Sequence, residues 1–281
     1  MSAFCLKSSN SSKANPRCDC LDEGEDSHSL VECDFLSIGF SEEFCAGNVY
    51  AAVKGRLKSS VSFWASTLDA PQFTLDAIVH GYRIPFASYP APCFLSNNLS
   101  ALRHPDFVVC AISELLDNGC IAEHSEPPFC VNPLTVVEGK KLRLAIDLRH
   151  VNCHLVRFKF KYEDVHSLSQ VLQKGHWFFT WDLKSGYHHV DISADHQKYL
   201  GFAWAFNGVL RYFIFTVLSF GLSSVCSCLP NCCARSMGHN SFVYLHDGFG
   251  SQLERTSAVA AFIQHKELDS SGLLVNEEKS H

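Results

Sequence analysis

Residues Trp177–Ile192 read WFFTWDLKSGYHHVDI, and this stretch decides how the rest of the chain is interpreted. Its aromatic first part has the composition of a β-strand, and Asp182 follows directly. Ser185 and Gly186 predict a turn, after which residues 187–192 alternate as a strand does. A single Asp after a strand more often caps a turn than catalyses a reaction, so its meaning depends on its neighbours.

A second apolar strand with an acidic end follows later in the chain. Residues Phe242–Gly250 read FVYLHDGFG, in which the pair Asp247-Gly248 predicts a hairpin turn between two short apolar segments. Two adjacent strands that each end in a carboxylate can share divalent metal ions, which is the arrangement that phosphoryl transfer needs.

These two stretches resemble the palm of reverse transcriptases. WDLKSGYHHVDI is similar to the first catalytic motif of that family, and YLHDG is similar to its tyrosine-x-Asp-Asp motif. The resemblance is to DIRS-like retrotransposon polymerases in particular, and it covers roughly residues 53–281. Further segments occur in the order that the family has them: GYRIPF, LRLAIDLRHVN, KFKYED, DHQKYLGF, RYFIFTVLSFGLSS and LLVNEEKSH.

The resemblance implies an α+β fold with the fingers and palm of a right-hand polymerase. The palm would be an antiparallel sheet backed by helices, and the thumb is expected to be absent. We expect an acidic, disordered tail over residues 1–48 and an N-terminal extension and linker over 49–103. Residues 104–176 would then be mostly fingers, and residues 177–281 mostly palm.

The implied reaction is template-directed DNA synthesis with two Mg²⁺ ions. Its partners would be an RNA or DNA template-primer and deoxynucleoside triphosphates. The implied metal ligands are Asp182, Asp247 and the backbone of Leu183, and Lys279 would protonate the leaving pyrophosphate. His246 stands at the position of the first Asp of the catalytic pair. Imidazole is a poor Mg²⁺ ligand, which predicts an impaired enzyme and leaves Mn²⁺ or Zn²⁺ open as alternatives.

A basic hairpin tip is predicted at residues 138–141, between strands over 131–137 and 142–148. Mobile cationic side chains there suit a triphosphate, and a solvated basic turn is the alternative. In the family, the residue at Tyr187 excludes a ribose 2′-hydroxyl; a core aromatic is the alternative here. The implied nucleotide-binding residues are Lys140, Lys141, Arg143, Tyr187, Phe220 and Gly221.

Periodicity and turn signals predict the remaining elements. Asp147 and Arg149 should share one face of a strand and form an ion pair, and Asn207-Gly208 should form a hairpin turn. In the last helix, Val259, Phe262 and Ile263 are expected to face inward. Helices are predicted over 73–80, 104–120, 165–173, 223–237 and 256–268, and strands over 120–123, 196–205, 209–215 and 273–276.

Composition limits the class of protein. The chain has 281 residues, of which 47% are hydrophobic, and a net charge of −6. Residues 1–50 hold three Lys or Arg and nine Asp or Glu, so they account for the whole net charge. We find no apolar run of the roughly 20 residues that a membrane helix needs and no signal-peptide core, which predicts an intracellular protein without a membrane.

Fourteen cysteines raise the question of disulfides or zinc. The densest groups are Cys18-x-Cys20 and the set Cys226, Cys228, Cys232 and Cys233, and neither has zinc-finger spacing. We therefore expect reduced thiols. Three interpretations stay open: an impaired reverse transcriptase domain, a non-catalytic nucleic-acid or protein-binding module with the palm fold, and a Cys-rich metal-binding protein. The oligomeric state stays open too.

Overall fold

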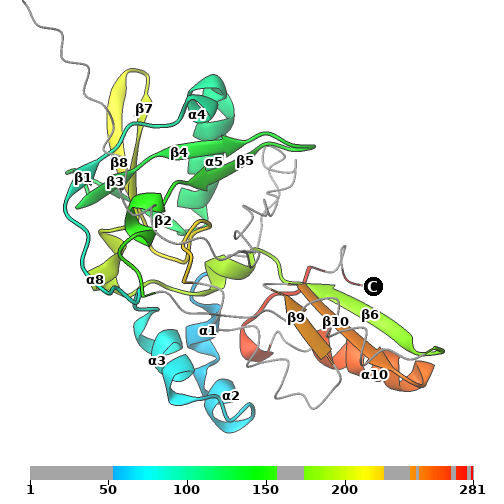
Figure 1. The fold of residues 1–281 in the computed structure, drawn as a ribbon. Coiled ribbons are helices and arrows are strands. Elements are labelled where there is room, and N and C mark those ends of the chain that lie inside the picture. Colours follow the sequence, from blue (N-terminus) through cyan, green and yellow to red (C-terminus); the bar gives the residue numbers. More distant parts are fainter. Residues whose placement is uncertain are drawn as a thin grey trace, which may run out of the picture. The chain divides into compact units, whose positions relative to one another are not determined.

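The fold is α+β, as predicted (Figure 1). The computed structural model describes residues 53–156, 174–224, 241–244, 247–266, 270–276 and 280. All of them belong to one compact unit, Cys33–His281. The predicted tail and the predicted helix over 165–173 lie outside the described residues. Of the predicted helix over 223–237, only residues 223 and 224 are described.

Three short helices begin the described chain: α1 (Arg56–Ser59), α2 (Val61–Ser66) and α3 (Gln72–His80). Trp64 of α2 is fully buried, and its indole Nε1 donates a hydrogen bond to the carbonyl of Ser271, 2.7 Å away. This contact ties the N-terminal helices to the last described segment of the chain.

The largest sheet has five strands in the order β1-β3-β7-β8-β2. Its pairings β1–β3 and β3–β7 are parallel, whereas β7–β8 and β8–β2 are antiparallel. Asn207 and Gly208 link β7 to β8 with φ angles of 50° and 81°, which is the type I′ turn that this dipeptide predicts. The strands are β1 (Cys93–Phe94), β2 (Ile121–His124), β3 (Cys130–Asn132), β7 (Gly201–Phe206) and β8 (Val209–Phe215).

A separate two-stranded hairpin consists of β4 (Leu134–Val137) and β5 (Arg143–Ile146). The predicted single strand over 131–137 is wrong, because it is divided at Pro133 between two sheets. Proline has no N–H to offer a ladder, so pairing stops there and the chain changes partners. The basic tip between β4 and β5 is confirmed. Four helices flank these strands: α4 (Leu99–Arg103), α5 (Pro105–Asp117), α6 (Arg149–Asn152) and α8 (Ala194–Gln197).

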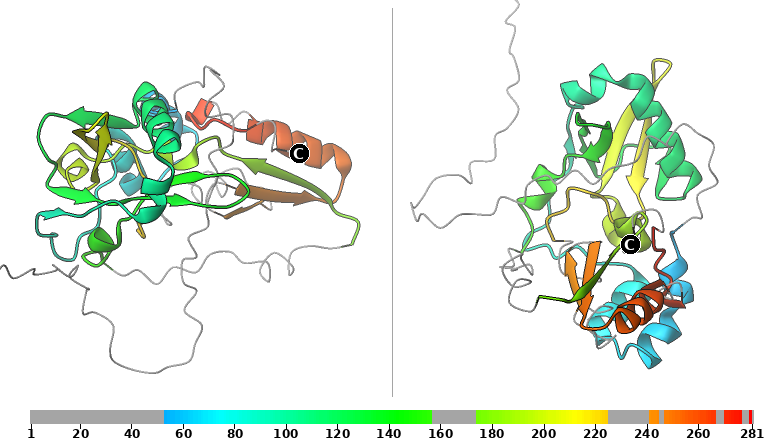
Figure 2. Two further views of the ribbon diagram at one scale, coloured as in Figure 1. Left: turned by 90° about the horizontal axis from the view of Figure 1, so that it is seen from above. Right: turned by 90° about the vertical axis from the view of Figure 1, so that its right-hand side faces the viewer.

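The third sheet is antiparallel throughout and consists of β6 (Trp177–Asp182), β9 (Ser241–Tyr244) and β10 (Asp247–Gln252). Its order is β6-β10-β9, and α10 (Arg255–Lys266) lies along one face of it (Figures 1 and 2). The Asp247-Gly248 signal misplaced the turn, because both residues lie in β10 and pair with Tyr244 and Val243 of β9.

The inward face of α10 differs from the prediction. Val259 is 48% exposed, whereas Ala258 and Ala261 are buried. Positions three apart share a helix face and the intervening Val259 does not, so the small alanines face the core. The side chains of Phe262 and Ile263 lie outside the described set.

Three other predicted strands need correction. Residues Gly186–His189 form a 3₁₀ helix (η2) instead of extended chain, and the strand expected from His196 begins only at Gly201, after α8. In both places buried histidines hydrogen-bond to backbone groups, which stabilises turns. Over 273–276 there is only an isolated bridge, between Val275 and Leu183.

A substitution at Gly81 tests the close packing between the end of α3 and the backbone at Ser193. It ends α3 with φ 83° and ψ 152°, a region that essentially only glycine enters, and an added Cβ would lie 2.6 Å from the Ser193 nitrogen. Gly81→Ala should therefore lower the free energy of unfolding by about 3 kcal/mol or more.

Gly55→Ala is the matched control, because Gly55 has φ 80° but open space where a Cβ would lie. It should cost only about 1 kcal/mol, from the left-handed backbone alone. Urea unfolding of both variants checks this, and equal losses of stability would contradict the predicted steric clash.

Candidate functional site

The two predicted catalytic aspartates are paired residues on neighbouring strands. Asp182 is the last residue of β6, Asp247 is the first of β10, and the antiparallel register places them directly opposite each other. Residues opposed in this way lie on the same face of a sheet. Asp182 is nearly buried, with 6% of its surface exposed.

The last described segment of the chain holds the end of β6 from its other side. The Asn276 N–H donates to the Asp182 carbonyl (2.8 Å), and the Lys184 N–H donates to the Leu274 carbonyl (2.8 Å). The side-chain amide of Asn276 also donates to Oδ2 of Asp182, 3.4 Å away. Asp182 is thus fixed between β10 and residues 274–276.

Two buried histidines follow Asp182 in η2. The Leu274 N–H donates to Nε2 of His189 (3.0 Å), so Nδ1 carries the ring hydrogen and donates to the Gly186 carbonyl (3.3 Å). This pattern requires a neutral ring. Burial lowers the pKa of His189 to about 4, and burial beside His189 lowers the pKa of His188 to about 4.

Tyr187 lies next to Phe220 and Gly221, which are also among the residues predicted to bind the nucleotide. The ring of Tyr187 meets that of Phe220 edge-on, with centroids 4.7 Å apart. Gly221 has φ 100°, and a Cβ there would lie 2.7 Å from the Ile146 carbonyl, so this glycine permits a close approach to β5. Tyr187 is half-buried and packs against the hydrophobic core, so both of its interpretations stay open.

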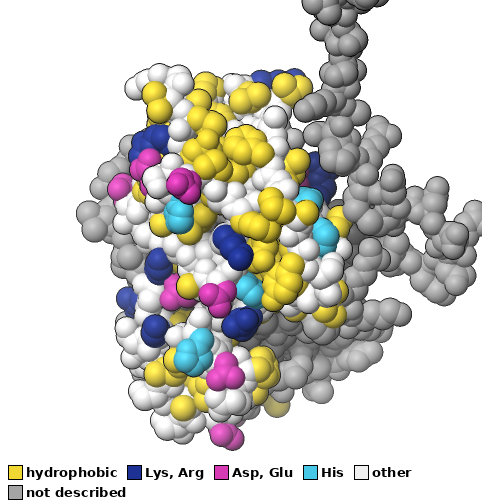
Figure 3. All heavy atoms as spheres, turned by 90° about the vertical axis from the view of Figure 1, so that its left-hand side faces the viewer, with side chains coloured by type: hydrophobic (Ala, Val, Ile, Leu, Met, Phe, Trp, Pro, Cys, Tyr) yellow, Lys and Arg dark blue, Asp and Glu magenta, His cyan; other side chains and the backbone are white. Residues whose placement is uncertain are grey.

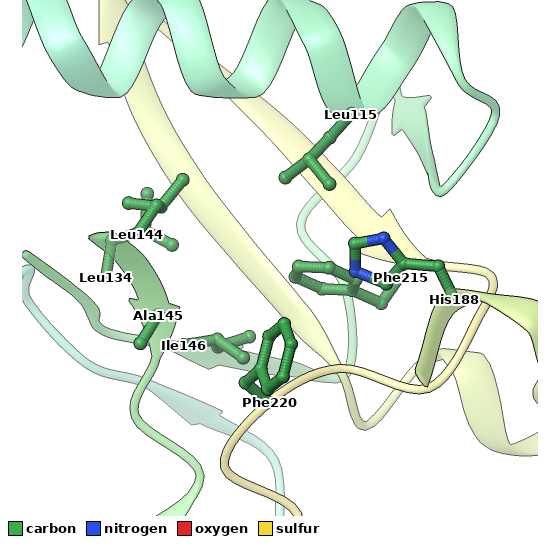
Figure 4. A pocket seen from close by; sticks show the side chains of 8 residues that line it. All are labelled: Leu115, Leu134, Leu144, Ala145, Ile146, His188, Phe215 and Phe220. Atoms are coloured by element: carbon green, nitrogen blue, oxygen red, sulfur yellow. The ribbon is translucent and has the colours of Figure 1, made fainter. Parts of the chain in front are cut away.

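An apolar pocket lies beside this group (Figure 4). Phe220 and His188 approach it from one side, and α5 and β5 contribute from the others. Its lining includes residues of η2, which follows Asp182, and of β5, which begins with Arg143. Its lining residues are Leu115, Leu134, Leu144, Ala145, Ile146, His188, Phe215 and Phe220.

The predicted triphosphate-binding cations lie at the β4–β5 tip. Lys140 is exposed, and Lys141 and Arg143 are half-buried. Nε of Arg143 is buried without a hydrogen-bond partner among the described residues. Glu138 at the base of the tip accepts from Nε2 of His104 (3.0 Å), which anchors the tip near the start of α5.

Some predicted site residues cannot be placed. His246 and Lys279 lie outside the described residues, as does the side chain of Asp247. Leu183 is described, and it forms the bridge to Val275.

The Asp147–Arg149 ion pair forms, but not on a strand. Nε of Arg149 donates to Oδ1 of Asp147 (2.9 Å), although β5 ends at Ile146 and Arg149 opens α6. Burial alone would raise the pKa of Asp147, yet the hydrogen bonds and charge of Arg149 outweigh it and lower that pKa. The pair therefore fixes the turn from β5 into α6, a structural role as predicted.

Sequence reasoning missed the polar residues that surround Asp182. His189 and Asn276 contact it or the segment beside it, and Asn152 donates to the Gly221 carbonyl (2.7 Å). The only sequence signal was a His-His pair within an otherwise apolar stretch, which favours buried, hydrogen-bonded rings.

One face of the described unit, on the side of β1, β3 and α8, mixes cations with hydrophobic groups (Figure 3). Nζ of Lys198 lies 5.3 Å from the ring centroids of both Phe129 and Tyr199. Over the described residues of this face, Lys and Arg are scattered and form no continuous stripe. None of the described helices is both long and apolar enough to cross a membrane.

Comparison with known proteins places this fold. No family model matches the chain. It is 27% identical over 118 residues to an enzymatic polyprotein of Cassava vein mosaic virus. This match covers 39% of this chain and 18% of the viral protein. Three solved structures of foamy virus protease-reverse transcriptase match with TM-scores of 0.53 to 0.56 and 18–20% identity.

Two of these structures are complexes, one with an RNA/DNA hybrid and one with double-stranded DNA. The match covers 69–71% of this chain but only 26–35% of the viral chains, so this chain corresponds to a fraction of their length. The likeness establishes that the fold is that of reverse transcriptase structures.

The buried histidines predict that stability falls with acid. Because their folded pKa values lie below the ordinary value, the unfolded chain binds more protons between pH 6.5 and 4. Stability is therefore full above pH 6.5 and is lost toward pH 4, by about 2 kcal/mol per histidine between pH 7 and 5.

In His189→Gln, the loss of unfolding free energy between pH 7 and pH 5 should be about 2 kcal/mol smaller than in wild type. Urea unfolding at pH 5, 6 and 7 measures this difference. The comparison with wild type is needed because burial raises the pKa of Glu114 to about 7, which acts in the opposite direction. His124→Gln, at an exposed position of β2, should keep the wild-type dependence. An unchanged dependence in His189→Gln would show that its ring is not held neutral.

Proposed function

We propose that this chain is the fingers and palm part of a DIRS-like retrotransposon reverse transcriptase, impaired at its metal site and acting inside the cell. The observation that carries this proposal is the direct pairing of Asp182 with Asp247 at one end of an antiparallel sheet. The fold shared with foamy virus protease-reverse transcriptase supports it. The ordered motifs of the sequence support it independently.

The donor set fits divalent Mg²⁺ in part. Two carboxylates on one face of a sheet are the hard oxygen ligands that Mg²⁺ prefers, and Asp182 and Asp247 would hold it with the backbone of Leu183. When bound, the ions would activate a primer hydroxyl and neutralise triphosphate charge. His246 supplies neither the hard oxygen nor the negative charge of a third carboxylate. Mn²⁺ accepts imidazole more readily and is the alternative ion.

The remaining residues would bind and orient the substrates. Arg143 and the lysines of the β4–β5 tip would contact a triphosphate, and the Tyr187–Phe220 pair would line the sugar and base. Asn152 and Ile146 hold Gly221 close to β5, which fixes the position of Phe220. Lys279 would protonate the leaving pyrophosphate. The proposed partners are a template-primer and deoxynucleoside triphosphates, as the nucleic-acid complexes of the structural neighbours suggest.

Restoring the third carboxylate tests the proposal. His246→Asp should strengthen Mg²⁺ binding on the order of tenfold or more, because affinity rises with the number of charged oxygen ligands. Titration calorimetry measures this binding, and primer extension on an RNA template with Mg²⁺ and with Mn²⁺ measures activity. Extension should be tested with the chain alone and with a thumb grafted from a related element.

The control is His246→Asn, which matches Asp in size but adds no charge, and it should leave Mg²⁺ binding weak. If His246→Asp binds Mg²⁺ no better than wild type, residue 246 is not at the metal site and the proposed catalytic hairpin is wrong. If binding rises but extension stays absent with the thumb, the chain is a non-catalytic module, and salt-dependent binding to nucleic acid then becomes its measurable function.

Tyr187 tests the nucleotide position in the active His246→Asp background. Removing its ring in Tyr187→Ala should lower discrimination against ribonucleotides by about tenfold or more, since the 2′-hydroxyl loses its steric block. Tyr187→Phe keeps the ring and should keep discrimination. Competition between ribo- and deoxyribonucleotides in primer extension measures it, and unchanged discrimination in Tyr187→Ala would make this residue a core aromatic only.

A further inference from the structure

Three side chains of metal-binding type converge away from the carboxylate pair. Cys93 of β1, Cys130 of β3 and His150 of α6 each place one ligand atom so that all three atoms lie within 4.8 Å of one another. Cys130 is fully buried, and the other two are half-buried. None of the three belongs to the proposed polymerase site.

The backbone brings the two sulfur atoms together. β1 and β3 lie side by side and parallel, with Cys93 and Cys130 as direct register partners (Figure 1). The Cys93 N–H donates to the Phe129 carbonyl (3.2 Å), and the Leu95 N–H donates to the Val131 carbonyl (2.9 Å). Hydrogen bonds on both sides of Cys93 therefore fix it beside Cys130.

The backbone carbonyl of Ala91 lies close to both the His150 imidazole and the Cys130 sulfur. Nε2 of His150 lies 3.4 Å from the Ala91 carbonyl, and Sγ of Cys130 lies 3.6 Å from it. His154 comes four residues later, and its ring centroid lies 5.6 Å from that of His150. Its Nδ1 lies 3.0 Å from the Ser88 hydroxyl.

We propose that Cys93, Cys130 and His150 bind one Zn²⁺ ion. Two thiolates and one imidazole are ligands that zinc prefers, unlike the hard oxygen ligands of the Asp182–Asp247 pair. His154 lies in the turn that follows α6, next to His150 but outside this three-residue cluster. The spacing of 36 and 19 intervening residues explains why no zinc motif is visible in the sequence.

The role of such an ion would be structural. β1 has two residues and α6 has four, which are short elements with few hydrogen bonds of their own. A shared zinc ion would link both to β3. Because Asn152 of α6 donates to the Gly221 carbonyl and accepts from the Ser223 N–H (3.1 Å), the ion would also stabilise the position of the Phe220–Gly221 segment.

Metal analysis of the full chain tests the proposal. Protein purified with zinc, and the same protein depleted and reloaded with Co²⁺, should hold one ion that the double variant C93S/C130S lacks. The visible spectrum of the Co²⁺ form should be that of a tetrahedral site with sulfur ligands. Cys110→Ser, at a half-buried cysteine of α5 outside this cluster, is the matched control and should keep the ion. Comparing variants also subtracts any ion held by cysteines elsewhere in the chain.

Variants of His150 and His154 provide a second test in case the cysteine variants fail to fold. Because His150 is half-buried, His150→Ala should fold and bind zinc about 100-fold more weakly or worse, whereas His150→Cys should restore binding with a third thiolate. His154→Ala should weaken binding less. Equal zinc content in wild type, C93S/C130S and His150→Ala would overturn the proposal. So would a Cys93–Cys130 disulfide in protein isolated under reducing conditions, detected by thiol trapping and mass spectrometry.

Discussion

The candidate site depends on the hydrogen bonding at the end of β6. Asp182 has β10 on one side, with Asp247 as its register partner, and residues 274–276 on the other. A buried backbone group without a partner is costly, and here both sides of the strand end are satisfied. A carboxylate at an open sheet edge could move with the edge, whereas the Asp182 carboxylate is held in position.

That arrangement in turn depends on contacts between distant parts of the sequence. Residues 271–276 are held by Trp64 of the N-terminal helices at one end and by His189 of η2 in the middle. The neutral ring of His189 joins the segment that contacts Asp182 to the turn that carries Tyr187. The N-terminal extension is therefore part of the frame of the site and is more than a linker, as the buried indole of Trp64 indicates.

Local signals predicted much of this architecture, and long-range pairing explains where they failed. Asn207-Gly208 forms its predicted turn because positive φ angles are a local property of those residues. Asp247-Gly248 carries a similar signal, but pairing with β9 draws both residues into a strand. The two aspartates were recognisable because Asp182 ends an aromatic strand and Asp247 follows an apolar one. Asn276 and His189 were not, because their roles arise only when residues nearly a hundred positions apart meet.

The residues that hold Asp182 in place differ from the residues proposed to bind metal with it. Hydrogen bonds join Asp182 to Asn276 and to Ser280, whose hydroxyl accepts from the Asp182 N–H. Neither of these partners is residue 246, so these hydrogen bonds are separate from the metal ligand that we propose at that position. If the proposed two-metal site is right, the third carboxylate can be lost while Asp182 stays paired with Asp247, because strand pairing and hydrogen bonding maintain that pairing. Retention of the fold is consequently no evidence that the reaction is retained, and metal affinity is the property that distinguishes an active copy from an inactive one.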